Sequence, residues 1–380
     1  MTSETPKIHH ANEDGLFTSA GGEDRNAPYS HYLGTYLEVY AGFATDPNNR
    51  QRVASGGLVT TLLAHGLREN MIDGVAVVKS DFSEQKIGYK FDILTDPDQV
   101  QSYGTSAYFN IPVEKHWKEL NDFDGRLGMC ALPCHTSILR NRKSTGRGLQ
   151  NVELFISLFC GHNNEIELLR FIFEKEGVQE SEVTDMRVNR SYLGGDVMVT
   201  LKDGKEVPIP FRHFNVYRSL GFFSKAMCRY CDDHLGGQAD LSIGDIFLKE
   251  YRGQDVKHSA VIVRNDIGQR LMHSAIEQKI VDVEQLSGEK VFRAQKRILT
   301  PSGDTVSRYH ACRLAGFTAK RPESGSFRLR SFFTYFMLHL NDRISRTKWG
   351  PKVLKWIPRP LLYAYIGSLK IINNTLRPRK

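Results

Sequence analysis

The sequence repeats one local pattern, in which a glycine- or cysteine-containing loop leads into apolar residues at helical spacing. In two of these units an apolar run suited to a buried strand precedes the loop, and in the third unit such a run follows the helix. Strands and helices that alternate along a chain are typical of α/β proteins, in which helices pack on a sheet. The units span residues 55–78, 126–139 and 152–173.

The loops of these units are candidate ligand sites. Ser55 is predicted to be the N-cap of a helix that begins at Leu58. Cys134 and Cys160 each follow a predicted strand and precede a predicted helix. Ligands of open α/β sheets bind beyond the carboxyl ends of strands, where helix N-termini present unpaired N–H groups. We therefore expect both cysteines to face a ligand.

A hairpin signal adds antiparallel pairing to this pattern. Residues 196–201 and 205–211 flank Asp203-Gly204, a dipeptide that favours a tight turn. The predicted fold class is therefore α/β, with a mixed sheet, flanking helices, an antiparallel hairpin region and a helical, basic C-terminal tail. The predicted segments are a disordered N-terminus at 1–31, an α/β domain at 32–145, a second domain at 146–310 and a basic amphipathic tail at 311–380.

The N-terminal residues contain no apolar stretch behind a basic start. We therefore expect a cytoplasmic protein whose six cysteines serve as ligands or buried thiols and not as disulfides.

The net charge of +8 is concentrated at the C-terminus. Residues 327–380 contain twelve Lys or Arg and a single acid, Asp342, whereas the rest of the chain has slightly more acids than bases. This distribution argues against a nucleic-acid partner. The tail also lacks the roughly 18 uninterrupted apolar residues of a spanning helix. It is predicted either to lie peripherally on an anionic membrane surface at the inner face, or to dock on the protein's own core or on a partner.

Four cysteines form the candidate metal site. Cys228 and Cys231 form a CxxC motif, whose spacing lets both sulfurs face one metal or cluster. Together with Cys134 and Cys160 they supply the four thiolates that a [4Fe–4S] cluster needs. Zinc and inert buried thiols are the alternatives. The remaining cysteines, Cys130 and Cys312, are predicted to be small buried thiols.

Three further segments are candidate flavin contacts. The loop Ser55-Gly56-Gly57 offers backbone N–H groups and a helix N-terminus to an anion such as a pyrophosphate. Residues 104–108 add hydroxyl groups and the ring of Tyr108, and Asp240 and Asp245 bound a short predicted strand where they could orient a ring or relay protons. Capped turns, packing and turn formation are the alternative roles of these residues.

Taken in order, the motifs resemble those of a known family, the beta subunit of deazaflavin (F420) coenzyme hydrogenase/dehydrogenase, over about residues 32 to 300. The segments that carry the resemblance are Ser55-Gly-Gly57, Ile72-Asp-Gly74, Leu132-Pro-Cys134, Leu158-Phe-Cys160, Cys228-x-x-Cys231-Asp232 and Ala239-Asp-Leu-Ser-Ile-Gly-Asp245.

The resemblance implies an iron-sulfur flavoprotein oxidoreductase that moves electrons between a [4Fe–4S] cluster and a substrate or deazaflavin at FAD. Residues 32–145 are then expected to contact FAD, and residues 146–310 to hold the iron-sulfur and flavin site. The implied cluster ligands are Cys134, Cys160, Cys228 and Cys231. The implied FAD contacts are Ser55, Gly56, Gly57, Thr60, Ser106, Tyr108 and Asp245.

The chain departs from the family pattern at three positions, where Ala131 replaces Gly, His135 replaces Gln and Ala107 replaces Lys. The lost lysine removes a cation that could pair with a flavin phosphate. An N-terminal ferredoxin module is absent as well, so a ferredoxin or a partner subunit is the expected electron donor. Family members without this module resemble parts of surface-polysaccharide pathways. The alternative function is a cluster- or zinc-stabilised scaffold that has lost flavin chemistry.

Overall fold

A computed structural model describes residues 29–375 except 54, 105, 190–194, 252, 255, 303 and 324. Most of the segment predicted to be disordered, residues 1–28, lies outside this part of the chain. The main element is an eight-stranded sheet in the order β11-β1-β10-β9-β5-β4-β2-β3. Its strands are β1 Glu38–Ala44, β2 Gly74–Asp81, β3 Gly88–Leu94, β4 Leu127–Ala131, β5 Val152–Leu158, β9 Leu241–Asp245, β10 Ser259–Val263 and β11 Val281–Gln285.

The sheet is mixed, which confirms the predicted fold class. Strands β2, β4, β5 and β9 pair in parallel, while β3, β10, β1 and β11 pair in antiparallel fashion with their neighbours. The strands come from both segments predicted as domains, 32–145 and 146–310, so the boundary near residue 145 falls between two paired strands of one sheet.

Helices cover both faces of the sheet because its strands alternate their side chains. On β10, Val261 and Val263 pack in one core with helices α3 (Leu58–Arg68) and α9 (Asp266–Glu277). Ala260 and Ile262 belong to a second core on the opposite face, which contains residues of α10 (Gly288–Ser302). Helices α5 (Trp117–Asp122) and α6 (Pro133–Ser144) contribute to a third core against β4 and β5.

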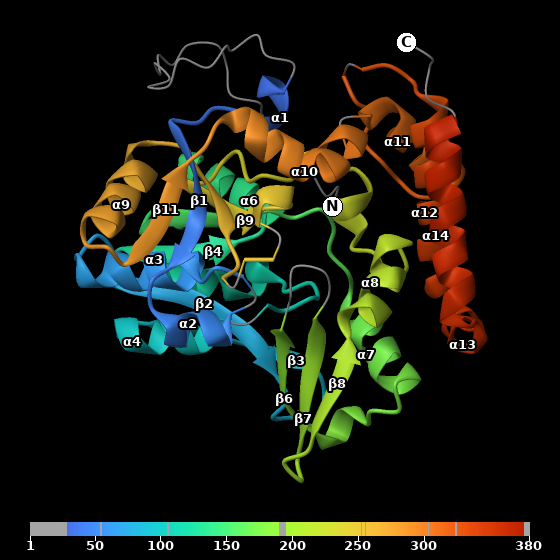
Figure 1. Ribbon diagram of the computed structural model, residues 1–380, viewed down its shortest axis with the longest axis horizontal. Helices are drawn as coiled ribbons and strands as arrows, with labels where there is room; N and C mark the ends of the chain where they lie inside the picture. Colours follow the sequence, from blue (N-terminus) through green and yellow to red (C-terminus); the bar gives the residue numbers. More distant parts are fainter. Residues whose placement is uncertain are drawn as a thin grey trace.

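The predicted hairpin is confirmed and belongs to a small antiparallel sheet of β6 (Val183–Asn189), β7 (Asp196–Leu201) and β8 (Glu206–Pro210). Gly204 occupies the turn with a φ of +81°, a conformation that glycine adopts without strain. The small sheet packs with α7 (Ile166–Lys175) and α8 (Phe211–Ser219) in a separate core. In Figure 1 it lies below the large sheet.

The C-terminal region is helical, as predicted, and consists of α11 (Thr305–Leu314), α12 (Leu329–Ser345), α13 (Gly350–Trp356) and α14 (Arg359–Thr375). Figure 1 shows α12, α13 and α14 along one side of the molecule, where α13 contacts α7 and α14 contacts α8. None of the helices in the described residues is long and apolar enough to cross a bilayer. The remaining short elements are α1 Ser30–Leu33, α2 Pro47–Arg52, α4 Pro97–Val100, η1 Gln101–Tyr103, η2 Val113–His116, η3 Glu180–Glu182, η4 Ala226–Arg229 and η5 Lys249–Tyr251.

Asp240 links the central strands at their amino-terminal edge. Its carboxylate is fully buried and accepts hydrogen bonds from the Phe155 N–H at 2.7 Å, the Asn265 amide at 2.6 Å and the Arg140 guanidinium. Asn265 is in turn the N-cap of α9. Asp240 therefore has a structural role and lies away from the carboxyl ends of the parallel strands.

We expect Asp240→Ala to lower the free energy of unfolding by about 3 to 5 kcal/mol, because it leaves Arg140 and a buried N–H without their partner. Thermal or urea unfolding measures this loss. Asp203→Ala, at the exposed hairpin turn, is the control and should stay within about 0.5 kcal/mol of the parent protein. Equal stability of the two variants would contradict the assigned role of Asp240.

Candidate cofactor site at one edge of the sheet

The carboxyl ends of β1, β2, β4, β5 and β9 lie at the same edge of the large sheet, as their pairing directions require. Cys134 follows β4 at the start of α6, and Cys160 follows β5. The loop at residues 55–57 follows β1 and α2 and leads into α3. The chain therefore brings together at one edge segments that lie far apart in the sequence.

The four predicted ligands, called the cysteine quartet below, lie within electrostatic range of one another. They are Cys134, Cys160, Cys228 and Cys231. Burial raises the pKa of Cys134 and Cys160 to about 11 and that of Cys228 to about 12, and it raises the pKa of Cys231 well above its usual value. Negative charge on the other members of the quartet raises each of these pKa values further.

Backbone contacts hold the loops that carry the quartet. The Cys160 N–H donates to the His234 carbonyl at 2.9 Å, and His234 Nδ1 lies 2.7 Å from the Cys160 carbonyl oxygen. The Asn163 N–H donates to Cys228 Sγ at 3.3 Å. The loop after β5 is thereby joined to the segment that contains the CxxC motif, although the two are about 70 residues apart in the sequence.

Zinc and a [4Fe–4S] cluster both accept four thiolate ligands. Among the described residues, no three His, Cys, Asp or Glu side chains are close enough to hold a single ion. A zinc ion would need four sulfurs about 2.3 Å from one point. In a [4Fe–4S] cluster each thiolate would instead bind a different iron atom.

Basic side chains surround the quartet. Arg308 on α11 is buried and donates to the carbonyl oxygens of Cys231 at 2.6 Å and Cys228 at 3.1 Å. Arg218 lowers the pKa of Cys160, and Lys225 lowers that of Cys134, although burial outweighs both effects. This positive charge favours thiolates and would offset the negative charge of a thiolate-bound cluster.

A second contact fixes the CxxC segment to the C-terminal helices. Asp342 on α12 is fully buried, and its carboxylate accepts hydrogen bonds from the Ser224 N–H at 3.0 Å, Arg229 at 2.6 Å and Arg346 at 2.9 Å. Ser224 and Arg229 flank Cys228. Part of the predicted tail is therefore docked on the protein's own core, beside the candidate metal ligands.

The glycine loop, residues 55–57, has a different cap from the predicted one. Gly57, with a φ of +80°, is the N-cap of α3 and makes no side-chain cap bond. The Ser55 hydroxyl instead lies 3.1 Å from the Ser259 hydroxyl, which also accepts from the Gly56 N–H at 3.2 Å. A Cβ atom at residue 56 would lie 2.9 Å from the Gly42 carbonyl oxygen, so close packing excludes a side chain there.

Thr60 and the segment 104–108 pack against the glycine loop. The buried Thr60 hydroxyl donates to Asn49 at 3.2 Å and to the Gly57 carbonyl at 3.3 Å, so it supports the loop from within. A Cβ atom at Gly104 would lie 2.5 Å from Val53, so the start of the segment 104–108 packs against the residues that lead into the glycine loop. The two predicted flavin segments are therefore neighbours.

Within the segment 104–108, Ser106 and Tyr108 differ in burial and in what they contact. Ser106 is half-buried, and Thr105 lies outside the described residues. The Tyr108 ring packs edge-on against Phe211 and Phe214, with centroids 5.3 and 5.5 Å apart. Tyr108 therefore contributes to the core around the small sheet.

Two residues that sequence reasoning missed connect the quartet to the glycine loop. Phe159, next to Cys160, donates its N–H to the Ile243 carbonyl at 2.8 Å, and a side chain at Gly244 would collide with its ring. Asp245, the next residue, pairs in register with Ser259, which contacts the glycine loop. Phe159 lies in the Leu158-Phe-Cys160 motif without a predicted role, and Ser259 lies in none of the motifs, so only the tertiary structure shows what these two residues contact.

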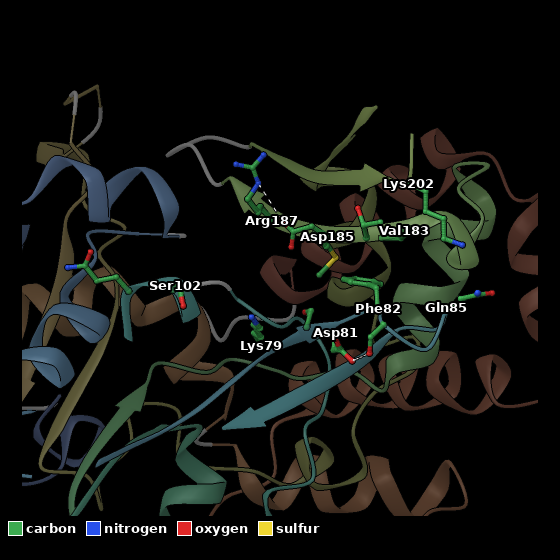
Figure 2. A pocket seen from close by; sticks show the side chains of 15 residues that line it. Lys79, Asp81, Phe82, Gln85, Ser102, Val183, Asp185, Arg187 and Lys202 are labelled. Carbon is green, nitrogen blue, oxygen red and sulfur yellow. Dashed lines mark hydrogen bonds and ion pairs between the residues drawn. The ribbon is translucent and has the colours of Figure 1, made fainter. Parts of the chain in front are cut away.

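A cavity of about 690 Å³ opens beside the segment 104–108 and extends to the small sheet. Figure 2 shows Lys79, Asp81 and Ser102 on one side of it, and Arg187 and Lys202 on the other. Its wall is mostly polar and charged. Lys79 Nζ lies 4.6 Å from the ring centroid of Tyr103, and Lys202 pairs with Glu182 at 3.8 Å.

The cysteine quartet and the glycine loop lie at the carboxyl edge of the sheet, where α/β proteins bind their cofactors. The protein is therefore of the α/β class, with a candidate redox-cofactor site at that edge. Residues 39–118 match the family model for the N-terminal part of the coenzyme F420 hydrogenase/dehydrogenase beta subunit, and residues 124–289 match the model for its C-terminal part. The chain belongs to this family, which confirms the predicted resemblance and makes it an oxidoreductase component.

Curated relatives and a solved structure agree with this assignment. The coenzyme F420 hydrogenase subunit beta of Methanothermobacter thermautotrophicus is 27% identical over 285 residues, which are 70% of this chain and 95% of that protein. The same subunit of Methanococcus voltae is 20% identical over 264 residues, covering 68% and 88%. In a structure of the F420-reducing [NiFe] hydrogenase complex from Methanosarcina barkeri, one chain shares the fold with a TM-score of 0.59 at 18% identity, covering 77% of this chain and 98% of that one.

In protein reconstituted with iron, we expect Asp342→Asn to speed iron loss to a chelator, because Arg229 and the Ser224 N–H lose their charged partner and the Cys228 segment is released. Asp304→Asn is the matched control, since Asp304 is another buried acid of the C-terminal helices, paired with Arg328 at 3.2 Å. Iron release at the same rate from both variants would refute a role of Asp342 in holding the CxxC segment.

We also expect stability to fall as the pH drops below about 6.5. Burial lowers the pKa of His162 and His339 to about 3, so the unfolded chain binds protons that the folded chain excludes. The stabilisation is complete above the unfolded pKa and is lost progressively toward the folded one. At pH 5.5 each histidine should cost about 1.4 kcal/mol of unfolding free energy. His339→Gln should weaken this dependence when unfolding is measured at pH 7.5 and 5.5.

Proposed function

We propose that this chain is an iron-sulfur flavoprotein oxidoreductase that moves electrons between a [4Fe–4S] cluster, held by the cysteine quartet, and a substrate or deazaflavin coenzyme at FAD. The observation that carries the proposal is the position of the quartet and the glycine loop at the same edge of the sheet, linked through Phe159 and Ser259. Family membership supports the redox class.

The quartet suits a cluster by its chemistry. Four thiols are the ligand set of a [4Fe–4S] cube, which would supply single electrons. The Asn163 N–H directed at Cys228 Sγ provides the kind of hydrogen bond that tunes such a group. Arg308 and Arg218 stabilise the thiolates that a metal requires, against the desolvation that raises their pKa values.

The glycine loop suits the phosphates of FAD, which would exchange a hydride with the substrate. The loop precedes the N-terminus of α3, a helix of eleven residues whose dipole favours an anion. Gly56 and Gly57 are themselves buried, and the Gly56 N–H already donates to Ser259, so the helix dipole and the half-buried Ser55 carry this part of the proposal. In this proposal Ser55 and Ser106 border the cofactor directly. Thr60, Tyr108 and Asp245 act indirectly, because they position the loop and its neighbours.

The substrate of this proposal is polar. The cavity beside the segment 104–108 is lined by hydroxyl, amide and charged side chains, which suit a carbohydrate better than a lipid. This lining supports a carbohydrate substrate, as a role in surface-polysaccharide biosynthesis would require. The relatives named as hydrogenase subunits support a partner subunit as the separate electron donor, and a ferredoxin is the other donor in this proposal.

A second candidate function is a metal-stabilised scaffold that no longer uses a flavin. It is favoured by Ala107, which stands where the family pattern has a lysine, and by Tyr108, which packs into the core around the small sheet. Such a scaffold would retain the quartet and the docked C-terminal helices without an FAD.

The two functions are separated by absorbance spectra with iron, sulfide, zinc and flavin analysis of protein purified and reconstituted without oxygen. We expect about four irons per chain and one FAD, with absorbance that bleaches on reduction. Cys228→Ser should lose most of the iron, whereas Cys130→Ser, outside the quartet, should keep it. Ser259→Ala should lower FAD content and leave the iron unchanged.

Protein that carries iron but binds no FAD after reconstitution would establish the scaffold function. Protein that binds zinc in place of iron, with a normal unfolding transition, would refute the redox proposal altogether.

A further inference from the structure

Helix α13 presents its apolar side chains to solvent. Trp349, the N-cap residue, is followed at helical spacing by Lys352, Val353 and Trp356, so these four share one face. Trp349 is 57% exposed, Val353 46% and Trp356 86%. The inward face contributes the buried Leu354. The outward face, called the α13 face below, is thus the reverse of an ordinary amphipathic surface helix.

Specific contacts hold α13 in this orientation. Lys175 on α7 donates to the carbonyl oxygens of Leu354 at 3.3 Å, Lys355 at 2.6 Å and Ile357 at 3.1 Å, which caps the end of the helix. Lys355 also pairs with Glu174 at 2.6 Å, and Arg359 pairs with Glu176. The exposure of the tryptophans is therefore built into the fold.

Exposed apolar side chains are concentrated in the same region. Of the thirteen large exposed apolar residues in the described chain, ten lie between residues 314 and 371. On α14, Leu361 is 61% and Ile371 64% exposed. Helices α12 to α14 form one side of the molecule in Figure 1. Such a concentration on a surface marks an interaction site.

The charge around this surface is positive. Lys348 and Lys352 are exposed and form no ion pair within the described residues. The single acid between residues 327 and 375, Asp342, is fully buried and paired with Arg229 and Arg346. The α13 face therefore offers apolar rings and unpaired lysines, and the neighbouring Glu174 is paired with Lys355.

We propose that the α13 face, together with Leu361, binds the interface of a bilayer that contains anionic phospholipids. Tryptophan has an apolar body and an N–H donor, which suits the boundary between headgroups and acyl chains. Lysines beside it attract anionic headgroups. This inference is independent of the cofactors proposed above.

The test is flotation of the full-length protein with vesicles of phosphatidylcholine alone or mixed with phosphatidylglycerol. We expect binding to the anionic vesicles that weakens as the ionic strength rises. Lys348→Gln/Lys352→Gln should weaken partitioning about 30-fold, at roughly fivefold for each lysine near the surface. Lys86→Gln/Lys115→Gln is the matched control, because it removes two exposed lysines elsewhere and should leave binding unchanged.

Fluorescence tests the tryptophans directly. The chain contains three, so in Trp117→Phe the emission comes from Trp349 and Trp356 alone. Anionic vesicles should shift this emission to shorter wavelength as the rings leave water. In the full-length parent background, Trp349→Ala/Trp356→Ala should abolish flotation while keeping the parent melting temperature.

Protein that stays in the aqueous fraction with both vesicle types would overturn the proposal. The same conclusion would follow if both lysine double variants floated equally, or if the two tryptophans were instead needed for dimer formation in solution.

Discussion

Parallel pairing of β2, β4, β5 and β9 is the constraint on which the rest of this structure depends. Because these strands run in the same direction, the loops that follow them emerge at one edge. Asp240 reinforces the alignment by bonding β5, α6 and the cap of α9 at once. The cysteines after β4 and β5, and Asp245 at the end of β9, are placed near one another as a direct result.

The C-terminal helices complete the site from outside the segment that matches the family. Arg308 and Asp342 both reach the CxxC segment, one through the carbonyl groups of its cysteines and the other through residues on either side of Cys228. The segment predicted as a basic tail, residues 311–380, thus has two parts with different roles. Helices α11 and α12 hold the CxxC segment, and α13 turns its aromatic residues outward.

Burial and nearby positive charges act in opposite directions on the pKa values of the cysteine quartet. Burial raises the pKa of every thiol in the quartet, so the metal-free protein would keep them protonated at neutral pH. Nearby guanidinium groups and a helix N-terminus lower the cost of the anionic forms. In the proposed function, deprotonation and metal binding would therefore be coupled. His234, Arg308 and Asp342 hold the loops that carry the four cysteines.

The sequence by itself determined the α/β class, the hairpin, the helical C-terminus and the candidate ligands, because apolar periodicity, turn residues and cysteine spacing are local signals. The sequence also identified Asp342 as the single acid among twelve bases in residues 327–380, but it did not indicate which residues Asp342 contacts. Only the tertiary structure decided that Gly57 and not Ser55 caps α3, that Ser259 supports the glycine loop, and that Arg308 reaches the CxxC segment. These contacts join residues that are distant in the sequence. They depend on strand order and on helix docking, which no local sequence pattern encodes.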